Sequence, residues 1–589
     1  MKRWLTLFVC SLAMACTAAA LDREAFTVTR YQLDVQIDRA SHVMAVTGQL
    51  TLRNDSKSPQ KYATLQVSSS LSWNGIVLDR TPVEWIGNNY TSDIDHTGGL
   101  SEAIVTLPKD VPPGGTVNLD VQYGGTVTPD STRLTRMGAP AEMALRNDWD
   151  QISEPFTAIR GLGYVAWYPV SLPAVSMSDG NAVFDAIGAW QFRQQRTEFD
   201  ARIHVISGDA KLCIVGNATT SSCGEMGGTE NPRTGGRVGQ ITNSIHLNGL
   251  GQTIPTFSVA DYVQLEHSGA TLFHTPEKIS LARDYAAAAE ANESVLHEWL
   301  NPAVQVPTVI ELTDPNTSPY QNGAVLFTPL RQSETATLSL LLLPVQVAAR
   351  FPSPHRWIED GLQRFLQVVS VERRSRRKGA LQFLDEYLAP LVKAEESASA
   401  EPGSAAKSTD SHAADDTLLN TSDEILLRGK GSFVFWMLRD MMGDEALQHA
   451  LATYRPGADL NPAYFQNLLQ EGKKRDLEWF FDDWVYRNRG LPDFRVENAY
   501  VRPLLGDPSK IVLVTVTVEN RGNAGAEVPV VIQTPSGERV VRVLVRAHQK
   551  ASGRSQVPAP PTKVVVNEGS VPEINSGDNT FEIPASPAP

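Results

Sequence analysis

The chain has 589 residues, with 52 lysines and arginines against 66 aspartates and glutamates, which gives a formal net charge of −14. This length exceeds what one hydrophobic core can organise, and it predicts roughly three or four domains. The excess of acidic side chains argues against nucleic-acid binding, because nucleic-acid phosphates repel an acidic surface. We therefore expect a multidomain protein without a nucleic-acid partner.

The first residues have the pattern of a secretory signal peptide. Lys2 and Arg3 precede an apolar run that ends in a cluster of small residues. We exclude residues 1–20 from the fold, which removes two of the 52 basic residues and leaves 50 against 66 acidic ones, a net charge of −16. No later apolar run is long enough to cross a bilayer. We expect an exported protein, periplasmic or secreted, with no transmembrane helix in the mature chain.

The cysteines fit an oxidising compartment. Cys213 and Cys223 are close in the chain and are predicted to form a disulfide, because disulfides persist in exported proteins. The alternative, two free thiols with a redox role, lacks a C-x-x-C spacing. Cys16 raises the alternative of a lipid anchor, although Ala13 and Met14 match the lipoprotein pattern poorly.

Alternating apolar residues predict a β domain over residues 25–261. Four of them, Tyr31, Leu33, Val35 and Ile37, fall on one face of an expected strand. A similar alternation in VTVTV and in VPVVIQ predicts a C-terminal β-sandwich over residues 493–575, followed by a tail at 576–589.

The residues between these two β regions, 262–492, predict a mostly helical domain. Pro276 opens an expected helix whose apolar positions recur at steps of three and four residues as far as Trp299. Within this domain the segment Glu395 to Asp416, EESASAEPGSAAKSTDSHAADD, is polar and of low complexity. Such a composition predicts a disordered loop.

Several segments carry a further pattern. In chain order they are GYVAWYPV (163–170), SPYQNGAVLFT (318–328), WIEDGLQRFLQ (357–367), LRGKGSFVFWMLRDMMGDEALQHALATY (427–454) and DLEWFFDDWVYRNRGLPDF (476–494). Together they resemble signatures of the aminopeptidase N family of zinc metallopeptidases, the gluzincins. The resemblance implies a multidomain α+β fold with an N-terminal β-sandwich, a thermolysin-like, mostly helical catalytic-type domain and a C-terminal β-sandwich.

The zinc motif of that family is degenerate in this chain. Family members bind zinc through the two histidines of H-E-x-x-H and a later Glu, while the Glu beside the first His activates water. The resemblance places these two histidines at Thr337 and Leu341 and the water-activating Glu at Leu338, within TLSLL. His297-Glu298 is an H-E pair, but Asn301 stands where its second His is required, so the sequence contains no H-E-x-x-H.

The other site positions also differ from the family. By resemblance, the third zinc ligand is replaced by Asp360, the Glu that holds a substrate's amino group by Gln321, and the catalytic Tyr by Arg428. An amide offers no charge to an ammonium group, and a guanidinium donates no phenolic proton. Asn322 and Gly323, together with Gln321, are the substrate contacts that the resemblance retains.

Ordinary structural interpretations account for the same residues. The segment TLSLLLLPVQV (337–347) is consistent with a buried helix, or a helix end broken at Pro344. Glu359 and Asp360 are typical first-turn acids stabilised by the helix dipole. Arg428 is placed to neutralise Asp360 or a neighbouring acid. The motifs G-x-S-x-G, P-loop and G-x-G-x-x-G are absent from the sequence.

We therefore predict a catalytically inactive pseudopeptidase that binds peptides or protein partners and holds no zinc. The alternative is an active metallo-aminopeptidase, or another peptide hydrolase, with a rebuilt site. The sequence does not indicate an oligomeric state.

Overall fold

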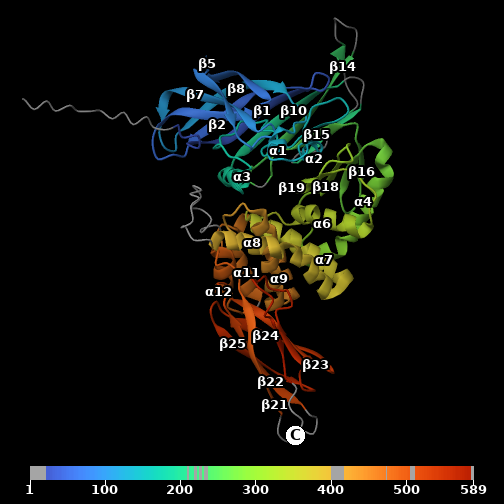
Figure 1. The fold of residues 1–589 in the computed structure, drawn as a ribbon. Coiled ribbons are helices and arrows are strands. Elements are labelled where there is room, and N and C mark those ends of the chain that lie inside the picture. The colour runs from blue at the N-terminus through green and yellow to red at the C-terminus, as the bar shows by residue number, and fades with distance from the viewer. Residues whose placement is uncertain are drawn as a thin grey trace, which may run out of the picture.

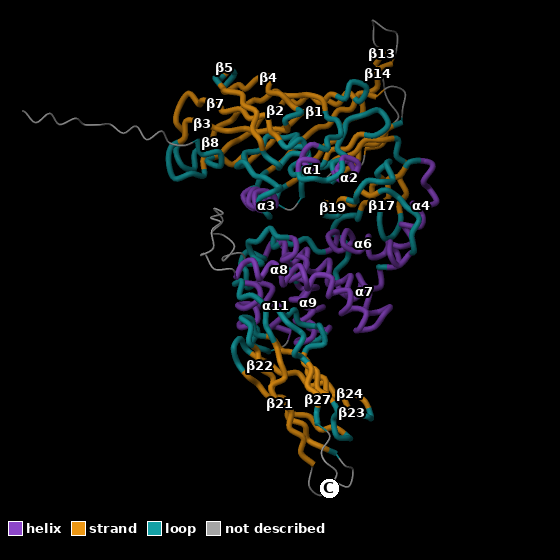
Figure 2. The backbone as a smooth tube through the Cα atoms, in the orientation of Figure 1, coloured by secondary structure: helices purple, strands orange, loops and turns teal. Residues whose placement is uncertain are grey.

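The structure is a computed structural model that describes residues 21–207, 211–217, 222–224, 229–230, 237–251, 253–399, 417–472, 474–503 and 511–584. An N-terminal β-rich region, a helical middle region and a C-terminal β region follow one another along the molecule (Figure 1). Strands dominate both ends and helices the centre (Figure 2). The expected signal peptide at 1–20 lies outside the described residues.

The N-terminal region is built from strands whose side chains alternate between core and solvent. Its elements are β1 (Phe26–Asp38), β2 (Val43–Asn54), β3 (Gln60–Ser68), β4 (Leu71–Leu78), β5 (Thr81–Pro82), β6 (Trp85–Thr91), β7 (Gly99–Val111), β8 (Thr116–Thr126), α1 (Thr132–Arg136), α2 (Ala141–Asn147), β9 (Thr157–Ile159), α3 (Ala182–Arg193), β10 (Glu198–Ser207), β11 (Leu212–Gly216), β12 (Ser222–Gly224), β13 (Thr229–Glu230), β14 (Arg237–Leu247) and β15 (Phe257–Ala260). The strands form one eight-stranded sheet, β13-β14-β10-β1-β2-β8-β4-β5, and two smaller ones, β12-β11-β15-β9 and β3-β7-β6. Tyr31, Leu33, Val35 and Ile37 of β1 are all buried, as the alternation predicts.

The predicted disulfide is confirmed. Cys213 on β11 and Cys223 on β12 face each other across an antiparallel pair and are joined by a sulfur–sulfur bond of 2.04 Å. The bond closes a short loop at the edge of the β12-β11-β15-β9 sheet, which restricts the unfolded chain.

The middle region combines helices with a five-stranded sheet, β16-β17-β18-β20-β19. Its elements are β16 (Val263–Glu266), β17 (Thr271–His274), η1 (Pro276–Lys278), α4 (Ile279–Ala291), α5 (Glu293–Trp299), β18 (Thr308–Glu311), β19 (Tyr320–Asn322), β20 (Val325–Thr328), α6 (Thr335–Arg350), α7 (Arg356–Leu384), η2 (Asp385–Tyr387), α8 (Leu388–Ser399), η3 (Ile425–Lys430), α9 (Gly431–Met442), α10 (Asp444–Thr453), η4 (Pro456–Ala458), α11 (Tyr464–Gly472), α12 (Glu478–Phe481) and η5 (Asp482–Tyr486). Helices α4 and α6 share an apolar core with this sheet.

Two expectations for the helices are corrected. The helix expected from Pro276 to Trp299 is divided into α4 and α5 at Asn292, whose buried amide donates to the carbonyl of Ser339 and to Gln346. Helix α8 runs through Ser399, inside the expected loop at 395–416, because Glu and Ala favour helix. The remainder of that loop, 400–416, lies outside the described residues.

Helix α6 does not end at Pro344 but continues to Arg350. A proline inside a helix leaves the carbonyl four residues earlier without its helical N–H donor. Here that carbonyl belongs to Leu340, and it accepts a hydrogen bond of 2.6 Å from Nε2 of Gln367 on α7. The side chain therefore replaces the missing backbone donor and ties α6 to α7.

Helix α7 and the start of α9 approach each other at two glycines. A Cβ added at Gly361 would lie 2.9 Å from the backbone carbonyl carbon of Gly431, and one added at Gly431 would lie 3.1 Å from the Cα of Gly361. The surrounding core includes Trp357 and Phe365 of α7 and Phe435 of α9. The absence of both side chains thus sets the spacing of the two helices.

The C-terminal region is a sandwich of two sheets, as expected. Its strands are β21 (Phe494–Pro503), β22 (Val512–Asn520), β23 (Ala526–Thr534), β24 (Gly537–Val545), β25 (Lys550–Val557), β26 (Lys563–Val566) and β27 (Thr580–Glu582). They pair in the orders β21-β22-β25 and β24-β23-β26-β27. Strand β27 lies inside the segment 576–589, which was expected to be a tail. It pairs with β26 and so extends the second sheet.

Among the described residues, no helix is both long enough and apolar enough to cross a membrane.

The glycine contact predicts the effect of one methyl group. Gly361→Ala is expected to lower the free energy of unfolding by about 1–3 kcal/mol, because its Cβ must displace backbone rather than a flexible side chain. Gly472→Ala in α11 is the matched control, since its Cβ meets nothing closer than 3.8 Å and alanine favours helix. Urea denaturation measures both variants, and an equal effect of the two would contradict the packing account.

Candidate functional site

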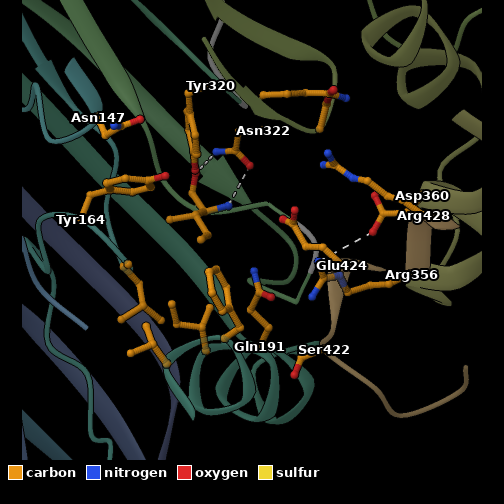
Figure 3. A pocket seen from close by; sticks show the side chains of 18 of the residues that line it. Asn147, Tyr164, Gln191, Tyr320, Asn322, Arg356, Asp360, Ser422, Glu424 and Arg428 are labelled. Atoms are coloured by element: carbon orange, nitrogen blue, oxygen red, sulfur yellow. Dashed lines mark hydrogen bonds and ion pairs between the residues drawn. The ribbon is translucent and has the colours of Figure 1, made fainter. Parts of the chain in front are cut away.

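A pocket of about 420 Å³ lies between the N-terminal and middle regions. Arg356, Asp360, Glu424 and Arg428 lie together on one side of it, facing Tyr164 across the cavity (Figure 3). The polar side comes from β19, α7 and η3, whereas α3 contributes apolar side chains such as Val183 and Ile187. The pocket therefore has a charged wall from α7 and η3 and mostly apolar side chains on α3, while Arg133 and Asp148 add a second charged pair from the N-terminal region.

The first turns of α7 supply most of the charged wall. The helix begins after His355, which has an extended backbone and follows Pro354. The backbone N–H of His355 donates a hydrogen bond to the hydroxyl of Ser353. The four residues that line the pocket from here have the spacing i, i+3, i+4 and i+7, which places them on one helical face. They are Arg356, Glu359, Asp360 and Gln363.

Asp360 is paired within its own helix. Its Oδ2 lies 3.7 Å from Nη2 of Arg356, and its side chain is only 16 % exposed. Burial raises the pKa of Asp360, while Arg356 and Arg428 oppose the rise. Arg428, the cation expected beside Asp360, makes no ion pair with it within 4.0 Å, and Arg356 is the nearer cation.

Glu359 lies beside Asp360 in the same wall. Burial, and next the negative charge of Asp360, raise the pKa of Glu359 to about 8. A glutamic acid with such a pKa is mostly protonated at neutral pH. The Glu359 carboxyl is therefore a neutral group that can donate a hydrogen bond into the pocket.

The predicted substrate contacts lie on β19 and the turn after it. The Gln321 side chain donates to the carbonyl of Gly323 at 3.2 Å and to Gln363 at 3.3 Å. The Asn322 amide is buried and donates to the Ile254 carbonyl at 2.5 Å and to the Thr256 hydroxyl at 2.9 Å. Although all three residues line the pocket, the amide of Asn322 is occupied in fastening β19 to residues 254–256.

Gly323 has a structural reason to be glycine. Its φ of +56° is in the left-handed region, and a Cβ there would lie 2.9 Å from the Thr253 side chain. The turn brings Gln321 back against its own chain, where the amide bonds the Gly323 carbonyl.

The three α6 positions predicted from the zinc motif do not line the pocket. Leu338 is 2 % exposed and packs in the core shared by α4, α6 and the five-stranded sheet. Leu341 packs against the same core, and Thr337 is exposed. The structure thus brings together Gln321, Asp360 and Arg428 but leaves these α6 positions outside the cavity.

The residues present do not fit zinc. Leu338 and Leu341 carry no donor atom, and a threonine hydroxyl is a poor partner for a metal that prefers imidazole, thiolate and carboxylate. Within the part of the chain that the structure describes, no group of three or more His, Cys, Asp or Glu side chains is arranged to hold a metal ion.

Several pocket residues come from outside the predicted set. Arg133 is held by the carbonyls of Asp93 and Gly163 and by Asp148 at 2.7 Å. Tyr164 contacts Tyr320 edge to face, with ring centroids 5.4 Å apart. Tyr164 belongs to the GYVAWYPV segment, which was a marker of fold, whereas nothing in the local sequence around Arg133 indicates a pocket.

Comparison with known proteins identifies the fold. No protein-family model and no curated protein sequence matches the chain. The structure is similar to aminopeptidase A from Legionella pneumophila, with a TM-score of 0.54 and 11% sequence identity over 93% of this chain and 59% of that one. It also matches an M1 zinc metallopeptidase from Deinococcus radiodurans, with a TM-score of 0.44 and 14% identity over 80% of this chain and 95% of that one. The likeness to the Legionella pneumophila protein shows that the chain has the multidomain α+β fold that its motifs predict.

The burial of Leu338 predicts an asymmetry between neighbouring α6 positions. Leu338→Ala is expected to reduce the free energy of unfolding by about 2–5 kcal/mol, since it opens a cavity in an apolar core. Thr337→Ala, the matched control on the exposed side, should change it by less than about 0.5 kcal/mol. Chemical denaturation distinguishes the two, and a neutral Leu338→Ala would place that side chain outside the core.

The raised pKa of Glu359 predicts a pH-dependent stability. The ordinary value is 4.5 and the folded value about 8, so the folded state holds this proton more tightly. The resulting stabilisation is complete below pH 4.5 and is lost as the pH rises towards 8. Glu359→Gln removes the ionisable group, and its melting temperature should exceed that of the unmodified protein at pH 8, with the gap narrowing towards pH 5.

The exposed Glu471 provides the control for this measurement. Glu471→Gln is expected to show the same small difference from the unmodified protein at both pH values. If the difference in melting temperature between Glu359→Gln and the unmodified protein does not change with pH, the assignment of a buried, protonated carboxyl is wrong.

Proposed function

We propose that the chain is an exported, catalytically inactive member of the aminopeptidase-like proteins, which binds peptides in the pocket without hydrolysing them. The observation that carries the proposal is the position of Leu338. It stands where the resemblance requires the water-activating glutamate, and it is buried in an apolar core. A carboxylate at this position would lose its hydration in an apolar core, which is unfavourable, so the packing around Leu338 is incompatible with the catalytic glutamate.

The remaining positions support the same proposal. Zinc-dependent peptide hydrolysis needs a metal that lowers the pKa of a bound water. Asp360, the only carboxylate among the three predicted ligand positions, lies 3.7 Å from a guanidinium nitrogen of Arg356. A bound cation would have to compete with that positive charge.

The pocket retains features of a ligand site. Its volume of about 420 Å³ falls within the usual range for small-molecule sites. Apolar side chains of α3 and charged side chains of α7 and η3 line the same cavity, a combination suited to a short peptide with an apolar side chain. The N-terminal pattern and the disulfide support export to the periplasm or beyond.

Glu359 favours one alternative, a metal-independent peptide hydrolase. A carboxyl whose pKa is raised to about 8 in a cavity can act as a general acid or base near neutral pH. A panel of exopeptidase and ester substrates tests this possibility. Hydrolysis that resists chelators and disappears in Glu359→Gln would establish it in place of the inactive protein.

Zinc content and hydrolysis, measured together, test the proposed function. The purified protein, dialysed after incubation with zinc, is expected to retain no stoichiometric metal and to leave aminoacyl and dipeptide substrates intact, because the α6 positions offer no imidazole. An active aminopeptidase assayed in parallel verifies the substrates. About one tightly held zinc per chain, with hydrolysis that a chelator abolishes, would contradict the proposal.

A further inference from the structure

Arg428 is a pocket cation without a close acidic partner among the described residues. It lies on η3 with its guanidinium towards the cavity (Figure 3). Within the described residues, this guanidinium makes no hydrogen bond and no ion pair within 4.0 Å. The other two pocket arginines differ: Arg133 is bonded to Asp148 at 2.7 Å, and Arg356 lies 3.7 Å from Asp360.

From this arrangement we infer that the pocket recognises a carboxylate of its ligand through Arg428. The inference rests on the proposed peptide-binding function and specifies its ligand, a peptide bearing a free carboxylate. A planar guanidinium offers paired N–H donors that match the two oxygens of a carboxylate, which makes arginine suited to this recognition.

The charges around Arg428 favour an anionic ligand. Asp360 is engaged by Arg356, and Glu359 is held mostly neutral at pH 7 because burial raises its pKa to about 8. The charges of Asp360 and then of Glu424 attract Arg428. Asp360, however, makes no ion pair with Arg428 within 4.0 Å, and the Glu424 side chain is exposed, where water weakens the attraction. Apart from the exposed Glu424 and the mostly neutral Glu359, the charged wall therefore carries two guanidiniums, those of Arg356 and Arg428, against the single carboxyl group of Asp360.

The pocket attracts an ammonium group of a ligand less strongly than a carboxylate. Gln321 is uncharged, and its amide N–H groups are directed to Gly323 and Gln363. In the same cavity, the apolar side chains of Val183 and Ile187 on α3 offer an apolar surface for a hydrophobic residue next to the carboxylate. The pocket thus fits the carboxyl end of a peptide with an apolar last residue better than its amino end.

Isothermal titration calorimetry with three blocked peptides tests the inference. Acetyl-Ala-Phe presents only a terminal carboxylate, acetyl-Asp-Phe-amide only a side-chain carboxylate, and Ala-Phe-amide only an ammonium. We expect acetyl-Ala-Phe to bind at least about tenfold more tightly than Ala-Phe-amide, as a charge-assisted hydrogen bond would require. If acetyl-Asp-Phe-amide binds more tightly than acetyl-Ala-Phe, Arg428 still recognises a carboxylate, but the carboxylate of an acidic side chain rather than that of the peptide's carboxyl end.

Variants connect the preference to Arg428. Arg428→Gln should weaken the binding of acetyl-Ala-Phe by about tenfold or more. Arg428→Lys keeps the charge but not the paired donors, and it should retain part of the affinity. Arg283→Gln replaces an exposed arginine of α4 away from the pocket and should leave binding unchanged. Circular dichroism verifies that each variant is folded.

The outcomes separate this inference from the proposed function. If Ala-Phe-amide binds as tightly as acetyl-Ala-Phe, or if folded Arg428→Gln binds normally, carboxylate recognition by Arg428 is wrong and peptide binding stands. If none of the three peptides binds, peptide binding itself fails, and the inference fails with it. Hydrolysis of an unblocked peptide would overturn the inactive character alone.

Discussion

The contact between Gly361 and Gly431 is the constraint on which the pocket depends. With no side chain at either residue, the backbones of α7 and α9 approach until an added Cβ would lie 2.9 Å from the opposing chain. Asp360 immediately precedes one glycine, and Arg428 lies three residues before the other. The close approach therefore brings the aspartate of one segment and the arginine of the other into a single cavity, although they are far apart in the chain.

The same helices show how far local patterns predict this fold. Alternation in β1 and β22 identified buried strands, because period-two burial needs only local sequence. Pro344 was an ambiguous signal, since its effect on α6 depends on whether another residue bonds the carbonyl of Leu340. Gln367 does so from a different helix, and only tertiary structure reveals that bond. The division of α4 from α5 at Asn292 likewise depends on distant partners.

The candidate site was predictable where a motif carried it. The segments around Gln321, Asp360 and Arg428 resemble family signatures, and the structure places all three residues in one pocket. The α6 positions were predicted only from their distance along the chain to Asp360. Such a distance does not indicate in which direction a side chain points. Leu338 turns into the core, whereas Arg133 enters the pocket from the N-terminal region, where no local pattern pointed to it.

The central claim is that the aminopeptidase fold here encloses a pocket without a zinc centre. Crystals grown with excess zinc and measured at the zinc absorption edge test it most directly. The account predicts no anomalous peak between α6 and Asp360, since Leu338 and Leu341 offer no donor atom. A strong peak about 2.0–2.2 Å from an oxygen of Asp360, with further protein ligands around it, would contradict the account.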